Sequence, residues 1–229
     1  GNGFVNHLYQ ITDEHNRSVI LKHAKPYLSF FGEDAAIPVP VERNRLEADT
    51  YRVRSAITPQ SFLKLLHIDQ NNHLFVQEYC DKPLMRRQLC QGQIFPEFGQ
   101  NIGELIAKNA FYTSELFLDQ SEHKLLQARF INPGMRRVME DILFDFMAPF
   151  GDDQESALFL ATHHDFGPQL LQDKILMMEV MCLRDIYMKR TDCLVHGDLH
   201  TSNIMIDQTG FKVFDLEYTH MGAYSGDLG

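Results

Sequence analysis

The sequence predicts an α+β fold of two lobes, in which a small antiparallel β lobe with one helix precedes a larger, mainly helical lobe. Residues 1–80 hold short, strand-like apolar segments separated by turn residues. Most of residues 81–189 instead carry apolar side chains at three- and four-residue spacing, as amphipathic helices do. A strand, a polar loop and a hairpin then occupy residues 193–217. We therefore expect one lobe at residues 1–80 and the second at residues 81–229.

Composition indicates a soluble globular protein. The 229 residues are 44% hydrophobic and 23% charged, with a net charge of −10 and an isoelectric point near 5.5. This acidic balance argues against nucleic acid as the main partner, and no apolar run approaches the ~20 residues of a membrane span. Cys80, Cys90, Cys182 and Cys193 lack CxxC or zinc-site spacing, which favours reduced thiols in the cytoplasm.

A glycine-bearing loop opens the chain with Gly1, Asn2 and Gly3 and leads through Asn6 into a hairpin. Such a loop can fold over nucleotide phosphates and donate backbone N–H groups to them. Many hairpins contain glycine only for turn geometry, so the signal is weak by itself. Because an ordinary domain does not begin inside such a loop, we expect a preceding strand to be missing.

The hairpin is predicted at residues 7–12 and 18–23, on either side of a polar turn. Its second strand is apolar at residues 19–21 and carries a single lysine, Lys22. This pattern is similar to the kinase strand whose lysine contacts the α- and β-phosphates of the nucleotide. The alternative is an edge-strand lysine that points into water.

One helix is predicted in the first lobe, at residues 41–51. Kinases hold the strand lysine in place with a carboxylate on a neighbouring helix. Glu47 lies in the middle of the predicted helix and is our candidate partner for Lys22. Glu42 and Asp49 are the rival carboxylates.

A further strand pair is predicted at residues 62–69 and 73–80, and it ends in a proline-containing connector. A two-lobed kinase would place its hinge at such a point, where backbone N–H and C=O groups contact the edge of adenine. Glu78, Tyr79 and Cys80 are therefore candidate nucleotide contacts.

After this connector the chain is predicted to be helical at residues 98–114, within 115–129, at 136–146 and at 170–189. The last of these segments has the clearest helical spacing of apolar residues. We interpret the methionines and phenylalanines of these helices as core-filling side chains rather than a cofactor site.

Three acceptor side chains lie at the mouth of the predicted hairpin in residues 193–217. Asp198 and Asn203 have the Asp-x4-Asn spacing of a phosphotransferase catalytic loop, and Asp215 follows where a metal-binding aspartate is expected. Phosphoryl transfer needs a carboxylate that takes the proton of the acceptor hydroxyl and oxygen ligands that hold Mg²⁺. Asp198 suits the first role, and Asn203 with Asp215 suits the second. The alternative is a turn followed by a solvated strand end.

These motifs resemble a known family. The stretches that carry the likeness, His196-Gly197-Asp198-Leu199-His200-Thr201 and Asp215-Leu216-Glu217, are similar to those of the aminoglycoside phosphotransferase and choline kinase superfamily. Residues 111–117 and 130–133 resemble its 5-methylthioribose kinase branch. The resemblance implies a bilobal protein-kinase-like fold, ATP and Mg²⁺ as cofactors, and phosphorylation of the 1-hydroxyl group of a small, sugar-like acceptor, 5-methylthioribose, in methionine salvage.

The resemblance also implies roles for individual residues. Asp198 becomes the catalytic base, Lys22 and Glu47 the phosphate-positioning pair, and Asp215 and Glu217 the metal-binding acids. The segment from residue 1 to residue 6 becomes a flexible lid over the phosphates. Members of this family are cytoplasmic homodimers, and we expect acceptor-binding arginines to lie beyond the last residue given, where the chain stops without a terminal helix.

Three functions remain open on the sequence alone. The first is a 5-methylthioribose kinase, and the second is a related kinase of another sugar, an amino alcohol or an aminoglycoside. The third is a pseudokinase that binds a nucleotide or a partner without turnover. The joint presence of Lys22, Glu47, Asp198, Asn203 and Asp215 argues against the third, because a pseudoenzyme has no need for all five.

Overall fold

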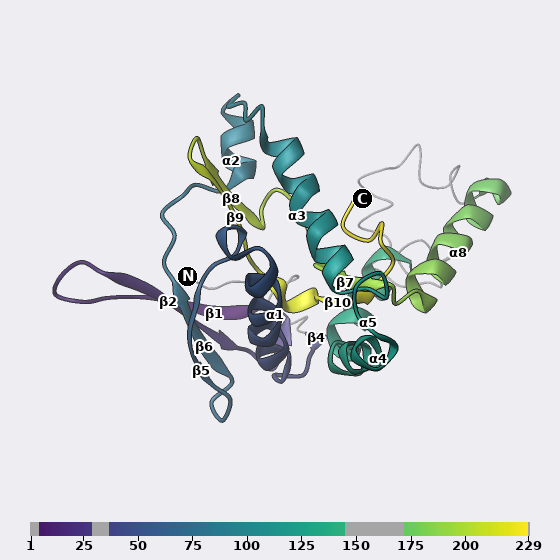
Figure 1. Cartoon of the computed structure of the whole chain (residues 1–229), viewed down its shortest axis with the longest axis horizontal. Helices are drawn as coiled ribbons and strands as arrows, with labels where there is room; N and C mark the ends of the chain where they lie inside the picture. Colours follow the sequence, from purple (N-terminus) through teal and green to yellow (C-terminus); the bar gives the residue numbers. More distant parts are fainter. Residues whose placement is uncertain (1–4, 29–36, 145–171, 229) are drawn as a thin grey trace.

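The computed structural model confirms the α+β class and describes residues 5–28, 37–144 and 172–228. Its main sheet holds four antiparallel strands in the order β1-β2-β6-β5. Their bounds are β1 Asn6–Thr12, β2 Ser18–Ala24, β5 Leu65–Asp69 and β6 Leu74–Glu78. In Figure 1 this sheet and helix α1 lie to the left of the helices α3, α4, α5 and α8.

The register of the sheet fixes which side chains share a face. Lys22 of β2 is paired with Phe75 of β6 and with Leu8 of β1. Phe75 is fully buried and makes an edge-on ring contact with Tyr51 of α1. Because directly paired residues point to the same face of a sheet, Lys22 is directed to the side of the sheet that α1 covers.

Helix α1 (Arg43–Ile57) is longer than the segment predicted at residues 41–51. Its buried residues recur at three- and four-residue spacing and continue past the predicted end to Arg54. Several of them are polar or charged, including Arg43, Asn44 and Arg54. Since the buried face is not apolar, hydrophobic periodicity could not mark the full length of this helix.

The remaining helices are α2 Met85–Cys90, α3 Phe98–Tyr112, α4 Gln120–Arg129, α5 Pro133–Leu143 and α8 Lys174–Lys189. The start of α4 is fixed by a capping box, in which Asp119 accepts from backbone N–H groups and Glu122 bonds back to the Asp119 N–H. Helix α2 was not predicted from the sequence. None of the helices in the described ranges has the length and apolar character that crossing a bilayer requires.

Helix α8 forms where it was predicted, but its apolar side chains are not core residues. It has no buried residue, and Ile175 and Met178 expose 75% and 68% of their surface. The prediction that these side chains fill the core is therefore wrong for α8 in this structure. Figure 1 shows the helix extending away from α4 and α5.

Three short strand pairs complete the described fold, and the first joins β3 (Tyr27–Leu28) to β4 (Ile37–Pro38). Strands β8 (Ile204–Asp207) and β9 (Gly210–Val213) form the predicted hairpin. Strand β7 (Cys193–Val195) pairs with β10 (His220–Gly222), a strand that the sequence analysis did not predict. The 3-10 turn η4 (Leu216–Tyr218) connects β9 to β10.

The hydrophobic core joins the sheet to the hairpin. Its buried members come from α1, α2, α3, β6, β8, β9, η4 and the segment just before β5, and they are Ala48, Tyr51, Phe62, Leu63, Phe75, Met85, Leu105, Ile204, Ile206, Val213 and Leu216. Packing of this kind fixes the loop between β7 and β8 and the turn after β9 relative to α1.

Glycine is required at position 197, in the loop between β7 and β8. Gly197 has a φ of +82°, a conformation that side chains disfavour. A Cβ atom there would also lie against the backbone oxygen of Tyr218, far inside van der Waals contact. The left-handed backbone conformation and the steric clash both disfavour any residue larger than glycine at this position.

We therefore expect Gly197→Ala to lower the free energy of unfolding by at least ~2 kcal/mol, because it adds left-handed strain to a backbone clash. Urea unfolding and thermal scans measure this loss, and the melting temperature should fall by roughly 4 °C or more. The matched control is Gly103→Ala, at an exposed position of α3 with open space around it. This control should be neutral or stabilising by up to ~1 kcal/mol. Equal stability of the two variants would contradict the assignment.

Candidate active site

A cluster of opposite charges joins three elements that are far apart in the sequence. Lys22 lies in β2, Glu47 lies in α1, and Asp215 lies between β9 and η4. Nζ of Lys22 is 2.8 Å from Oε1 of Glu47 and also forms an ion pair with Oδ1 of Asp215. The contact predicted between Lys22 and Glu47 is therefore present, while the rival Asp49 pairs with Arg52 and Arg129.

The electrostatics of the cluster favour its charged form. Burial by itself would lower the pKa of Lys22, but the carboxylates of Asp215 and Glu47 outweigh it and hold that pKa well above the ordinary value. Burial raises the pKa of Glu47. Burial also opposes the ionisation of Asp215, but the attraction of Lys22 prevails and lowers its pKa. The Lys22–Asp215 pair therefore stays ionised at neutral pH.

The backbone of Asp215 is in a costly conformation. Its φ of +64° places it in the left-handed region, which few residues other than glycine occupy. The flanking residues are held on both sides: the Phe214 N–H donates to the Asn203 carbonyl oxygen at 3.1 Å, and the Leu216 N–H donates to Oε1 of Glu47 at 3.2 Å. These bonds fix the direction in which the Asp215 carboxylate leaves the chain.

The loop between β7 and β8 brings Asp198 and Asn203 together. Nδ2 of Asn203 donates to the backbone oxygen of Asp198 at 2.9 Å and to its Oδ2 at 3.1 Å. Nε2 of His200 lies 3.5 Å from the same oxygen. The Asp198 side chain remains 29% exposed. Partial burial, together with the nearby Asp215 charge, raises the pKa of Asp198 above the ordinary aspartate value.

The buried side chain of His196 supports this loop, and this role was not predicted from the sequence. Its ring is buried, with Nε2 3.1 Å from the carbonyl oxygen of Phe214 and Nδ1 accepting from the Asp198 N–H at 3.2 Å. Burial lowers the pKa of His196 to about 4. The neutral ring can therefore donate from one nitrogen and accept at the other, which ties the loop to the strand leading into Asp215.

Asp227 is the second residue that sequence reasoning missed. Its carboxylate accepts from the backbone N–H of His196 at 2.8 and 2.7 Å and from that of Gly197 at 3.1 Å. The guanidinium of Arg54 lies 3.9 Å from it. No local pattern linked Asp227 to a loop some thirty residues earlier, so only the fold reveals this contact.

Glu217 is buried and held by three donors, two of which were not predicted. Its Oε2 accepts from Nδ2 of Asn6 at 3.0 Å and lies 3.4 Å from Nε of Arg43. Nδ2 of Asn132 donates to the backbone oxygens of Glu217 and Thr219. Burial, with the neighbouring carboxylates, raises the pKa of Glu217 to about 8.

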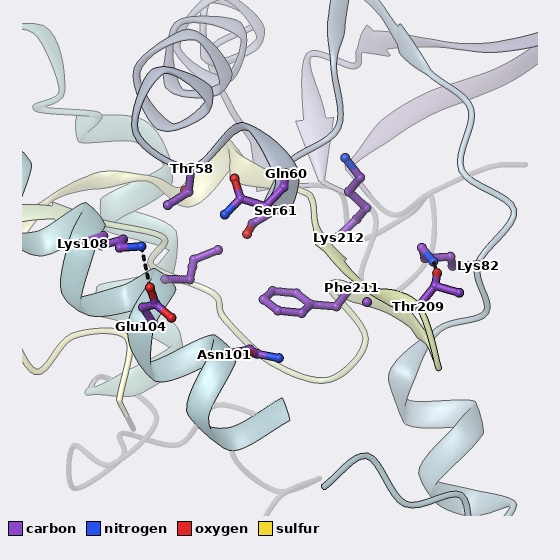
Figure 2. Close-up of a pocket in the computed structure, with 12 residues that line it drawn as sticks. Thr58, Gln60, Ser61, Lys82, Asn101, Glu104, Lys108, Thr209, Phe211 and Lys212 are labelled. Carbon is purple, nitrogen blue, oxygen red and sulfur yellow. Dashed lines mark hydrogen bonds and ion pairs between the residues drawn. The ribbon is translucent and has the colours of Figure 1, made fainter. Parts of the chain in front are cut away.

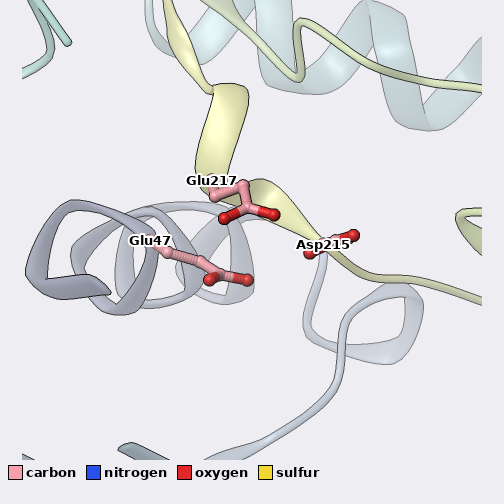
Figure 3. Close-up of side chains that lie close together, drawn as sticks. All are labelled: Glu47, Asp215 and Glu217. Atoms are coloured by element: carbon pink, nitrogen blue, oxygen red, sulfur yellow. The ribbon is translucent and has the colours of Figure 1, made fainter. Parts of the chain in front are cut away.

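The carboxylates of this region suit a hard cation. Glu47, Asp215 and Glu217 each offer an oxygen within 4.8 Å of the others, and Figure 3 shows Glu47 projecting from α1 toward the turn that carries the two other acids. Oε1 of Glu217 is buried without a hydrogen-bond partner. Buried, unpartnered carboxylate oxygen is a donor that Mg²⁺ prefers, so these residues fit the metal that the sequence motif implies.

The other predicted nucleotide contacts lie apart from this cluster. Gly1, Asn2 and Gly3 fall outside the described residues. Glu78 ends β6, where its N–H donates to the Lys64 oxygen at 2.9 Å and its carboxylate lies 3.3 Å from Nζ of Lys212. Tyr79 is exposed, and Cys80 packs half-buried against the core.

A pocket of about 430 Å³ lies between α3 and the β8–β9 hairpin (Figure 2). No predicted site residue lines it. Two of its lysines are occupied: Lys82 bonds to Asp207 at 2.5 Å, and Lys212 bonds to the Phe62 oxygen at 2.9 Å. We therefore do not place the chemistry in this pocket.

Comparison with known proteins identifies relatives of the whole chain. The family model described as "Phosphotransferase enzyme family" matches residues 1–229. Methylthioribose kinase of Geobacillus kaustophilus is 32% identical over 231 residues, covering 100% of this chain and 57% of that protein. Methylthioribose kinase of Yersinia pseudotuberculosis serotype O:1b is 31% identical over 238 residues, covering 100% and 56%. The chain thus spans a little over half the length of these relatives.

Solved structures share the fold at low sequence identity. A spectinomycin phosphotransferase in complex with ADP and spectinomycin matches with a TM-score of 0.57 at 14% identity, covering 100% of this chain and 64% of that one. An ethanolamine kinase of Plasmodium vivax matches with a TM-score of 0.52 at 17% identity, covering 97% and 56%. These likenesses confirm the predicted protein-kinase-like fold. Because the family model matches the chain from its first residue to its last, the chain belongs to the phosphotransferase enzyme family.

Proposed function

We propose that this chain carries the nucleotide-binding and catalytic residues of an ATP-dependent kinase that phosphorylates the 1-hydroxyl group of 5-methylthioribose. One observation supports phosphoryl transfer above all: the Lys22–Glu47–Asp215 cluster adjoins the loop of Asp198 and Asn203. The acceptor is taken from the names of the curated relatives, which are methylthioribose kinases.

In this proposal Lys22 contacts the α- and β-phosphates of ATP, and Glu47 keeps its ammonium in position. Lys22 points to the face of the sheet that α1 covers, and the residue is only 5% exposed, so its ammonium has little freedom to reorient. A cation held in this way stabilises phosphate charge without reorganising during the reaction.

Asp198 is the proposed catalytic base. Its carboxylate is partly exposed and is oriented by the amide of Asn203, and its pKa is raised. A raised pKa makes it a better acceptor of the proton that leaves the acceptor hydroxyl as the oxygen attacks the γ-phosphorus. The bond between the γ-phosphorus and the β–γ bridging oxygen then breaks, and ADP leaves. Neutral His196 accepts a hydrogen bond from the Asp198 N–H and so holds the backbone of the proposed base in place.

Asp215, Glu217 and the side-chain oxygen of Asn203 are the proposed metal ligands. Mg²⁺ held by these residues would supply positive charge that neutralises the nucleotide phosphates. Asn203 uses its Nδ2 to hold Asp198, so its Oδ1 is the atom left for a cation.

The remaining assignments also stand as proposals. Residues 1–80 form a nucleotide-binding lobe and residues 81–229 a catalytic lobe, with Glu78, Tyr79 and Cys80 along the adenine edge. Gly1, Asn2 and Gly3 lie over the phosphates, with Asn6 anchoring the segment that they begin. All four cysteines are free, which agrees with a cytoplasmic enzyme. Homodimerisation is carried over from the family alone.

A second candidate function is a kinase of an amino alcohol or an aminoglycoside. It is favoured by the fold neighbours, which include a spectinomycin phosphotransferase and an ethanolamine kinase, and by the net charge of −10, which suits cationic acceptors.

The acceptor is tested by ADP release from Mg-ATP. We expect strong stimulation by 5-methylthioribose and little response to ribose, ethanolamine or kanamycin. Activity with one of the other acceptors instead would keep the catalytic site and replace the substrate. ATP binding with no response to any acceptor would contradict the kinase proposal and favour a pseudokinase.

Substitution of Asp198 by Asn should lower kcat by 10² to 10⁴-fold, because it removes the base and leaves the phosphate-binding groups. ATP affinity, measured by calorimetry, should change little. Asp185→Asn in the exposed Asp185–Lys189 pair of α8 is the matched control and should leave both quantities unchanged. Activity of the unsubstituted protein should also fall on acidification at a higher pH than an ordinary aspartate would give. An equal loss of binding and turnover in Asp198→Asn would count against the role.

A further inference from the structure

Arg43, the first residue of α1, lies at the centre of a buried hydrogen-bond network. Arg43 itself belongs to none of the sequence motifs. The residue is 3% exposed. Its guanidinium donates to three backbone carbonyl oxygens, those of Val5 at 2.7 Å, Lys25 at 2.7 Å and Pro40 at 3.0 Å. These oxygens belong to the segments that precede β1, follow β2 and precede α1. One planar side chain therefore fixes three stretches of backbone.

The same guanidinium reaches the acidic turn after β9. Its Nε lies 3.4 Å from Oε2 of Glu217, and its Nη2 lies 3.3 Å from Oδ1 of Asn6. Nδ2 of Asn6 donates to the same Oε2 at 3.0 Å. Arg43, Asn6 and Glu217 thus form a closed triangle in which each side chain contacts the two others.

The two carboxylate oxygens of Glu217 differ in their hydrogen-bond partners. Oε2 is held by two donors, whereas Oε1 is buried without a hydrogen-bond partner. One oxygen of this carboxylate lies within 4.8 Å of a carboxylate oxygen of Glu47 and of Asp215. A carboxylate whose outer oxygen is fixed by donors presents its other oxygen in a defined direction. Groups that orient metal ligands in this way tune metal affinity without touching the ion.

We propose that Arg43 is a positioning residue, which with Asn6 aims Oε1 of Glu217 at the metal position and ties that carboxylate to the helix that carries Glu47. This inference rests on the proposed metal site, because the orientation of Glu217 affects metal binding only if Glu217 is a ligand of the ion. Lysine cannot replace arginine here, because its single ammonium has three donors, whereas the Arg43 guanidinium meets five acceptor oxygens.

The test is calorimetric titration of ADP, in excess Mg²⁺ and in EDTA, into the unsubstituted protein and into Arg43→Lys. We expect Arg43→Lys to weaken ADP binding by 10- to 100-fold in Mg²⁺ and by less than threefold in EDTA. Arg45→Lys, at an exposed position two residues along the same helix, is the matched control and should match the unsubstituted protein in both buffers.

A second variant covers the case in which Arg43→Lys does not fold. Asn6→Ala removes the other donor to Oε2 and should weaken ADP binding in Mg²⁺ in the same selective way. Circular dichroism establishes which variants are folded. Equal losses in Mg²⁺ and EDTA, or no loss in a folded variant, would overturn the proposal and leave the kinase assignment intact. If the unsubstituted protein binds ADP equally in both buffers, the proposed metal site and the role of Arg43 both fall.

Discussion

The rest of the structure depends on the burial of the Lys22 ammonium between the carboxylates of Glu47 and Asp215. Removing an ammonium from water is costly, and a buried ion pair compensates only when its partners remain in place. Loss of one partner typically costs 3–5 kcal/mol because it leaves a buried charge unpaired. The fold must therefore hold β2, α1 and the turn after β9 together whenever it is native.

Much of the surrounding architecture can be understood as support for that arrangement. Glu47 accepts from the Leu216 N–H as well as pairing with Lys22, so one carboxylate fixes both the lysine and the turn. The left-handed backbone at Asp215 is the strained point of this turn, and strain of this kind persists only where its surroundings enforce it. His196 and Asn203 bond to Phe214, which links the catalytic loop to the same turn.

Sequence reasoning succeeded where a motif carries its own local geometry. The hairpin of β8 and β9, the placement of Asp198 and Asn203 in one loop at its mouth and the pairing of Lys22 with Glu47 all follow from short patterns with known chemistry. It failed where contacts between residues far apart in the sequence determine the structure. Helix α1 was predicted too short because its buried face carries Arg43 and Arg54, whose burial only tertiary bonds make possible. Asp227 gave no signal, because its partners are backbone N–H groups in a distant loop. The apolar face of α8 was read correctly as helical, but periodicity reports an apolar face and not what covers it.

If the buried charge cluster is a metal-nucleotide site, Mg²⁺ must strengthen ATP binding through Asp215, and a Mg²⁺ titration of ATP binding by Asp215→Ala measures this. The unsubstituted protein should bind ATP at least tenfold more tightly as Mg²⁺ is added. Asp215→Ala should bind ATP with an affinity that Mg²⁺ no longer changes, because the substitution removes a ligand of the ion. Wild-type dependence on Mg²⁺ in a folded Asp215→Ala protein would contradict the account.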